Sequence, residues 1–178
     1  MGASRLIEVA AKYNCIVNVY PTQHGFVFDK TGGLPLNLRA RERIAYRQVE
    51  LARWRDYLGL PMHIKPAHFP VEDATPSHAI IAAMATGEDA MLLSYEIGRA
   101  QWEMEENISL VNTVERACER AGIDFAGLGD LSMWADEFKN NSHQAVKRGV
   151  FGYPTYIYEE ELFWGQDRLD FLERAISG

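Results

Sequence analysis

Two short segments near the carboxyl end carry the residue types best suited to binding chemistry. The first, GVFGYP, ends in Tyr153 and Pro154 at the start of an apolar, aromatic run, and the second, GQDR, contains Gln166, Asp167 and Arg168. A proline that opens a strand cannot donate a ladder hydrogen bond, so it lies at an edge or an end of a sheet. If the Tyr153–Pro154 bond is cis, the N–H and C=O of Tyr153 are exposed and can pair with an extended peptide, as an added strand does.

The GQDR segment opens the last predicted helix, and its side chains suit the head group of an amino acid. Free N–H groups at the start of a helix attract a carboxylate. Asp167 can accept hydrogen bonds from a ligand ammonium, and the forked guanidinium of Arg168 can hold a ligand carboxylate. The alternative is structural: Asp167 caps the helix, and Arg168 is solvated.

Composition indicates a globular chain with an ordinary core. Of its 178 residues, 47% are hydrophobic and 24% are charged, and the net charge of −7 argues against nucleic acid as the main partner. No apolar run approaches the roughly 18 residues of a membrane span, and the first residues lack the pattern of a signal peptide. Cys15 and Cys118 form no C-x-x-C motif, which indicates buried free thiols in a reducing, cytoplasmic compartment.

Periodicity predicts an α/β domain that is interrupted by a block of helices. A first helix around Leu6 to Tyr13 is followed by a strand over CIVNVY, 15–20, and then by a loop over 22–38. The block of helices is predicted over 39–58, 77–86, 88–105, 110–121 and 131–148. Ser109 is expected to cap the fourth of these helices.

The last part of the chain is predicted as strand, strand and helix, over 153–158, 161–164 and 167–176. The turn between the two strands is Glu159-Glu160, although a tight hairpin prefers Gly, Asn or Asp there because φ must be positive.

Arginines are concentrated in the predicted helix over 39–58, where acidic residues lie between them. This pattern favours a solvated helix face with i,i+4 pairs over a nucleic-acid surface, while one or two of the arginines can instead line a site for an anionic substrate. Most aromatic residues are expected in the core, and some can wall an apolar pocket for an aromatic substrate. The histidines show no metal-binding spacing, so no metal site is expected.

A family resemblance rests on the same segments. The run AVKRGVFGYPTYIYEEELFWGQDRLDFLE resembles the carboxy-terminal signature of the 2-hydroxychromene-2-carboxylate isomerases, which group with the kappa-class glutathione transferases in the DsbA-like branch of the thioredoxin superfamily. VELARWRDYLGLP and FKNNSHQAVKRGVFG resemble further parts of the family, and the likeness runs from about Gly2 to Ile176. It implies a thioredoxin-like domain over 1–38 and 149–178, interrupted by a helical insertion domain over 39–148.

The resemblance also implies glutathione as the cofactor. In the family, the residue before the cis-proline contacts the cysteinyl backbone, an Asp-Arg pair holds the γ-glutamyl end, and an Asn before the long helix is a further contact. The implied partners are glutathione and a small aromatic-derived substrate, with a homodimer as the expected assembly. The implied glutathione-binding residues are Tyr153, Pro154, Asp167, Arg168, Asn37 and Gln166.

The activity implied by the resemblance is isomerisation, in which a glutathione thiolate adds to an unsaturated substrate, permits rotation and is eliminated. The family carries a serine that faces the glutathione sulfur, on a turn after a first strand. We expect the sequence from Met1 to begin beyond that strand and turn, so no catalytic residue is assigned, and we expect Ser4 to be a helix cap or a surface residue. Three alternatives stay open: a kappa-type glutathione transferase, a DsbA-like thiol oxidoreductase, and an inactive glutathione-binding or structural homologue.

Overall fold

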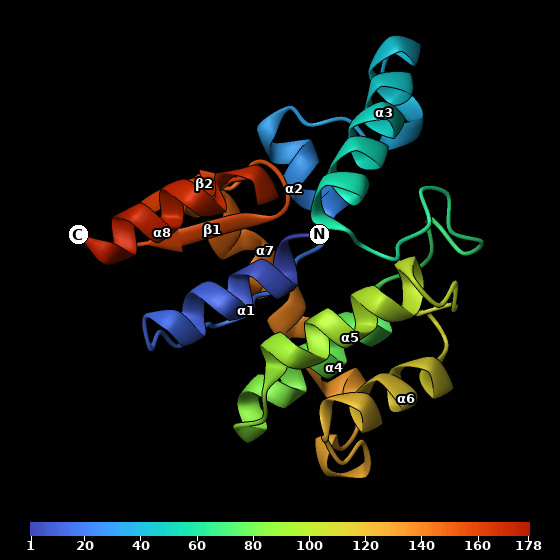
Figure 1. The fold of residues 1–178 in the computed structure, drawn as a ribbon. Coiled ribbons are helices and arrows are strands. Elements are labelled where there is room, and N and C mark those ends of the chain that lie inside the picture. The colour runs from blue at the N-terminus through green and yellow to red at the C-terminus, as the bar shows by residue number, and fades with distance from the viewer.

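The computed structural model describes all 178 residues, which form a mostly helical protein with one small sheet (Figure 1). The helices are α1 (Gly2–Lys12), α2 (His24–Thr31), α3 (Arg41–Leu58), α4 (Ala74–Thr86), α5 (Ala90–Trp102), α6 (Val111–Ala121), α7 (Ala135–Lys147) and α8 (Leu169–Ser177). The strands are β1 (Thr155–Tyr158) and β2 (Glu161–Trp164), and short 3-10 turns are η1 (Leu36–Leu38), η2 (Ala126–Leu128), η3 (Leu131–Trp134) and η4 (Gln166–Arg168). None of the helices combines the length and the apolar character needed to cross a membrane.

The larger core lies among α4, α5 and α6. Alanines of α4 such as Ala79 let the neighbouring helices approach closely, and Leu93 of α5 and Val114 of α6 are fully buried between them. Full burial of an aliphatic side chain contributes about 1.5–3 kcal/mol, so these helices form a rigid base for the loops around them.

A smaller core lies between the β1–β2 hairpin and α8, where Phe163, Leu169 and Leu172 are buried together. The two strands are antiparallel, and Glu159 and Glu160 both have positive φ in the turn that joins them. The hairpin predicted from sequence is therefore confirmed, with two glutamates in the left-handed conformation that usually favours Gly or Asn.

Helix α1 lies between the two cores and contacts both α5 and α8 (Figure 1). Two ion pairs tie it to α8: Arg5 to Asp170 at 2.7 Å, and Lys12 to Glu173 at 2.7 Å. This packing places the first turn of α1 beside η4, at the start of α8.

The expected strand over 15–20 is wrong. This segment is extended, and its residues alternate between half-buried and exposed, as in a strand, but it belongs to no sheet because the only ladder in the structure joins β1 to β2. Ile16 is 90% exposed. The alternating sequence pattern thus reflects one-sided burial against the helices rather than strand pairing.

Further corrections concern helix α2 and the helix caps. The expected loop over 22–38 contains α2, which ends at Gly32 in the left-handed conformation and buries Val27. Ser109 does not cap α6, which begins after Leu110, and instead hydrogen-bonds the side chain of Asn107. Ser4 is not a helix cap, because α1 starts at Gly2 without a side-chain cap. The other predicted helices are confirmed to within a few residues of their ends.

Candidate functional site

The hairpin brings together the two segments that the sequence singled out. Thr155 lies opposite Trp164 in the ladder, and the amide of Gly165 then donates a hydrogen bond of 2.9 Å to the carbonyl of Pro154. The peptide bond between Tyr153 and Pro154 is cis. The Pro154 loop and the Gly165–Arg168 segment therefore form one continuous surface at the end of the sheet.

The main chain of Tyr153 is available to a ligand, since neither its N–H nor its C=O forms a hydrogen bond in the structure. The side chain is held on the protein: its hydroxyl accepts a hydrogen bond of 2.8 Å from Thr22, and its ring packs against Phe28 with 5.8 Å between centroids. Burial raises the pKa of the Tyr153 phenol, which therefore stays neutral at physiological pH. A free donor and acceptor pair at the surface is the requirement for pairing with an extended peptide.

The carboxylate of Asp167 and the guanidinium of Arg168 lie side by side and are both exposed. The Arg168 Nη2 atom is 3.5 Å from an Asp167 oxygen, and the guanidinium also lies over the ring of Phe171. Neither η4 nor α8 has a side-chain cap, so the alternative in which Asp167 caps the helix is wrong. Gly165 has φ +106°, a conformation that residues with a side chain rarely adopt, and a Cβ there would also displace the Asp167 carboxylate.

Gln166 is half-buried and is held by Arg5 of α1, a residue that sequence reasoning missed. One guanidinium nitrogen of Arg5 donates to the backbone carbonyl of Gln166 at 3.2 Å and to its side-chain oxygen at 3.4 Å. Because the other Arg5 nitrogen pairs with Asp170, the start of α1 is pinned to η4 and α8.

Tyr156 is a second residue that the sequence argument did not select. Its hydroxyl lies against Gly2, where an added Cβ would be only 2.5 Å away, and burial raises the pKa of Tyr156 to about 12. Residues two apart in a strand share a face. The spacing between Pro154 and Tyr156 could therefore have predicted that Tyr156 lies on the same face as Pro154. No side chain caps the first turn of α1, which leaves its N–H groups to face this region with their positive partial charge.

Asn37 lies in η1 and is exposed, and its side chain makes no hydrogen bond to the Pro154 loop or to the Gly165–Arg168 segment. Its segment approaches the loop only indirectly: Arg39 stacks over the ring of Phe28, which in turn packs against Tyr153. A role for Asn37 in glutathione binding stays a prediction.

A cleft of about 190 Å³ opens on the other flank of the first turn of α1, between α3 and α5. Its walls include Ser4 of α1, Arg47 and Leu51 of α3, and Tyr95 and Trp102 of α5. The lining is therefore largely apolar and aromatic, and its charged side chains are those of Arg47, Arg99 and Glu103.

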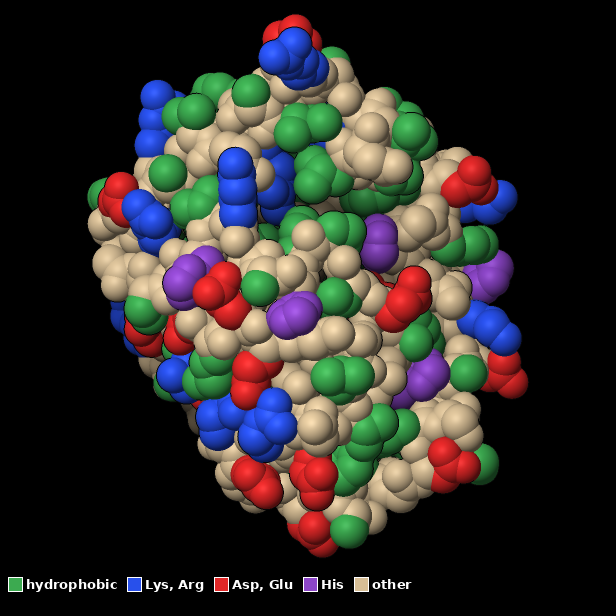
Figure 2. Space-filling view, turned by 90° about the vertical axis from the view of Figure 1, so that its right-hand side faces the viewer, with side chains coloured by type: hydrophobic (Ala, Val, Ile, Leu, Met, Phe, Trp, Pro, Cys, Tyr) green, Lys and Arg blue, Asp and Glu red, His purple; other side chains and the backbone are tan.

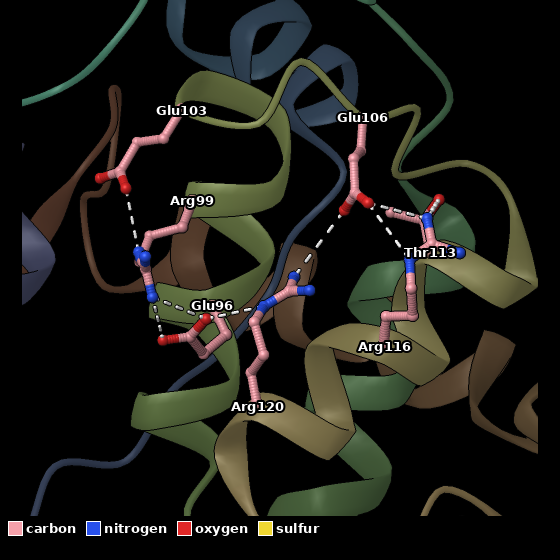
Figure 3. A network of polar contacts seen from close by, with 7 residues as sticks. All are labelled: Glu96, Arg99, Glu103, Glu106, Thr113, Arg116 and Arg120. Atoms are coloured by element: carbon pink, nitrogen blue, oxygen red, sulfur yellow. Dashed lines mark hydrogen bonds and ion pairs between the residues drawn. The ribbon is translucent and has the colours of Figure 1, made fainter.

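An ion-pair network fixes the α5 wall of this cleft to α6 (Figure 3). The buried carboxylate of Glu96 accepts hydrogen bonds from Arg99 at 3.0 Å and from Arg120 at 2.9 Å. Arg99 also donates to Glu103 at 2.9 Å, and Arg116 pairs with Glu106 at 2.9 Å. Because each of these carboxylates is already ion-paired with arginine, we assign the network a structural role in joining α5 to α6.

Metal ligands and the buried thiol were the other groups to consider as a reactive centre. No group of three or more His, Cys, Asp or Glu side chains is placed to hold a metal ion. Both cysteines are free, and Cys118 is fully buried, which raises the pKa of its thiol to about 11. A thiol with so high a pKa has little nucleophilic thiolate at neutral pH.

A comparison with known protein families shows to which family this chain belongs. The model of the DSBA-like thioredoxin domain matches residues 1–177. This protein is a member of the DSBA-like thioredoxin family. The DSBA-like fold that the sequence predicted, with its small sheet and large helical part, is confirmed by this match.

Curated relatives of this DSBA-like protein are 2-hydroxychromene-2-carboxylate isomerases. The protein from Pseudomonas sp. (strain C18) is 26% identical over 179 residues, which are 98% of this chain and 82% of the relative. That of Pseudomonas putida is 26% identical over 183 residues, with 99% and 87% covered, and that of Sphingobium xenophagum is 26% identical over 174 residues, with 95% and 87% covered.

A solved structure of a 2-hydroxychromene-2-carboxylate isomerase superposes on the DSBA-like protein with a TM-score of 0.81 at 24% identity. The superposition covers 99% of this chain and 87% of the other. It extends the likeness to the whole fold, and with the curated relatives it confirms the resemblance inferred from sequence.

Proposed function

We propose that this protein is a glutathione-dependent isomerase of the 2-hydroxychromene-2-carboxylate isomerase type. The observation that carries the proposal is the hydrogen bond from Gly165 to Pro154, because it places the free main chain of Tyr153 beside the Asp167–Arg168 pair. The isomerase names of the relatives support the reaction class. The thioredoxin-like part over 1–38 and 149–178 would bind glutathione, and the insertion over 39–148 would cover the substrate.

The donor set at this surface fits glutathione. A γ-glutamyl group carries an ammonium next to a carboxylate, and Asp167 and Arg168 offer one partner for each. The two side chains have only each other as charged partners in the structure, so a ligand can take them without breaking another ion pair. The unpaired N–H and C=O of Tyr153 suit the peptide backbone of the cysteinyl residue.

Bound glutathione would supply a thiolate that adds to an unsaturated substrate and later leaves it. The protein's residues hold the tripeptide in one orientation, and that orientation makes the encounter with the substrate effectively intramolecular. The first turn of α1 lies beside Gln166 and Tyr156, and its uncapped N–H groups would favour the thiolate over the thiol. Tyr156 stays neutral, because its raised pKa keeps the hydroxyl protonated and able to donate.

The test is turnover of 2-hydroxychromene-2-carboxylate, followed by absorbance with and without glutathione. We expect isomerisation above the uncatalysed rate only when glutathione is present, and we expect the glutathione concentration to stay constant. Consumption of glutathione into a stable conjugate would identify a transferase instead. Turnover that does not depend on glutathione, or no turnover at all, would contradict the proposal.

We also propose a reducing, cytoplasmic setting and a homodimer. The two free cysteines support the first, since neither is paired in the structure. Helix α3 supports the second: none of its residues is buried, and Tyr46, Val49 and Tyr57 expose their apolar surface.

A further inference from the structure

Only one side chain from another part of the molecule, that of Arg5 in α1, forms a hydrogen bond to the Gly165–Arg168 segment. Its Nη1 atom donates both to the backbone carbonyl and to the side-chain oxygen of Gln166, while Nη2 donates to Asp170. Over the upper part of the face in Figure 2, where α3 lies, other Lys and Arg side chains stand among hydrophobic ones, but α8 lies on the opposite side of the molecule (Figure 1). Arg5 is thus the cation that links an earlier helix to the candidate site.

The contact with Arg5 fixes which end of the Gln166 amide is free. A guanidinium has only donors, so the atom of Gln166 that faces Arg5 must be the oxygen Oε1. The Nε2 amino group at the other end of the amide is turned away from Arg5 and forms no hydrogen bond in the structure. Gln166 therefore offers two N–H donors to a ligand instead of an acceptor.

These donors belong to the same short turn as the Asp167–Arg168 pair. Gln166, Asp167 and Arg168 are the three residues of η4, and the first turn of α1 closes the other side, where a Cβ on Gly2 would lie 3.0 Å from the Gln166 Cβ. A ligand carboxylate has about four lone-pair sites, and the fork of one guanidinium uses two of them. An amide donor in the turn that holds Arg168 can satisfy a further site.

We propose that Arg5 is a positioning residue that aims the amide donors of Gln166 at the α-carboxylate of the γ-glutamyl group, which they bind together with Arg168. The inference rests on the proposed function, because it takes glutathione as the ligand. It adds a determinant of specificity: the site selects a γ-glutamyl group with its α-carboxylate over one without it. Arg5 contributes to this selection without touching the ligand.

The experiment measures, by calorimetry, the binding of glutathione and of γ-aminobutyryl-cysteinyl-glycine, which lacks only the α-carboxylate. We expect Arg5→Met to weaken glutathione about five-fold and to leave the affinity for the analogue unchanged, since a hydrogen bond to a charged group contributes on this scale. The matched control is Lys12→Met. Lys12 also joins α1 to α8, through Glu173 at 2.7 Å, but makes no hydrogen bond to Gln166, so this variant should change neither affinity.

Two further variants separate positioning from a structural role. Arg5→Lys keeps a charge for Asp170 but has no fork to hold Gln166 as well, so it should keep the Tm of the unmodified protein and still lose glutathione affinity as Arg5→Met does. Gln166→Ala should weaken glutathione by a similar factor, and adding Arg5→Met to it should weaken glutathione no further, because both changes remove the same interaction. If Arg5→Met does not fold, Arg5→Lys takes its place in this cycle.

Additive losses in the double variant, or equal losses for glutathione and for the analogue, would overturn the positioning role. So would a loss in Lys12→Met as large as that in Arg5→Met. If glutathione binds the unmodified protein and the Arg5 variants equally well, the positioning role fails while the proposed function stands. If the binding results are as expected but the protein does not turn over the chromene carboxylate, the proposed isomerase activity fails and the role of Arg5 stands, and absence of glutathione binding contradicts both.

Discussion

The buried carboxylate of Glu96 holds together the α5 wall of the cleft and helix α6 (Figure 3). It accepts two hydrogen bonds from Arg99, at 3.0 and 3.2 Å, and one of 2.9 Å from Arg120. We predict that Glu96→Gln, which keeps the size of the side chain but removes its charge, markedly destabilises the protein. Arg99 and Arg120 would then lose the carboxylate charge that they share.

The expected magnitude follows from the burial of the three groups. Breaking a buried ion pair by removing one partner costs about 3–5 kcal/mol. The side chains of Arg99 and Arg120 are 33% and 25% exposed, and Arg99 keeps Glu103 as a partner, so the lower end applies. We expect a loss of about 3 kcal/mol, which in a chain of this length lowers Tm by about 6–12 °C.

The assay is thermal and urea unfolding followed by circular dichroism. The matched control is Glu50→Gln, which removes an exposed i,i+3 partner of Arg53 on α3 and should leave the transition unchanged within error. An equal shift in both variants, or no shift in Glu96→Gln, would refute the reasoning that burial makes the Glu96 network strong.

Three further predictions concern the thiols, alkaline stability and Gly165. A disulfide-exchange reagent should modify half-buried Cys15 in the folded protein but reach fully buried Cys118 only on unfolding, and Cys15→Ser should abolish the fast phase. The pKa values of Cys118 and Tyr156, about 11 and about 12, lie above their ordinary values of 9.0 and 10.0, so the unfolded chain ionises first. The stability that these groups provide should therefore be complete below pH 9 and fall as pH rises towards 12, less steeply in Tyr156→Phe; an unchanged alkaline slope would contradict this. Gly165→Ala places a Cβ against the Asp167 carboxylate at positive φ, and should weaken glutathione binding in calorimetry while Gly98→Ala, with open space around it, does not.

The elements that the sequence predicted well are those with strong local signals. Helix α3, predicted over 39–58, ends at Leu58, and Gly59 follows in the left-handed conformation that stops a helix. The terminal helix, predicted over 167–176, carries Leu169 and Leu172 three residues apart, and both are buried. Such signals act within one or two turns of chain, which is why they can be read without knowledge of the fold.

Two of the failures, the strand over 15–20 and the role of Arg5, depend on distant neighbours. Alternation over 15–20 is real, but a strand also needs a partner, and pairing is not encoded in one segment. Helix α2 buries only Val27, so its apolar stripe is too thin to detect. In the candidate site, Pro154, Asp167 and Arg168 were found from local motifs, whereas Arg5 was missed because its contact with Gln166 crosses 161 positions.

Binding of glutathione is the most direct test of the candidate site, and calorimetric titration of the unmodified protein, Arg168→Ala and Arg174→Ala measures it. The two arginines form a matched pair, because Arg168 of η4 and Arg174 of α8 both lie over the ring of Phe171, at 5.8 and 5.6 Å. Only Arg168 lies beside Asp167. We predict saturable binding to the unmodified protein and to Arg174→Ala, and a loss of about ten-fold or more in Arg168→Ala. Absence of binding to the unmodified protein at millimolar glutathione, or equal affinity in both variants, would contradict the assignment of this surface as the glutathione site.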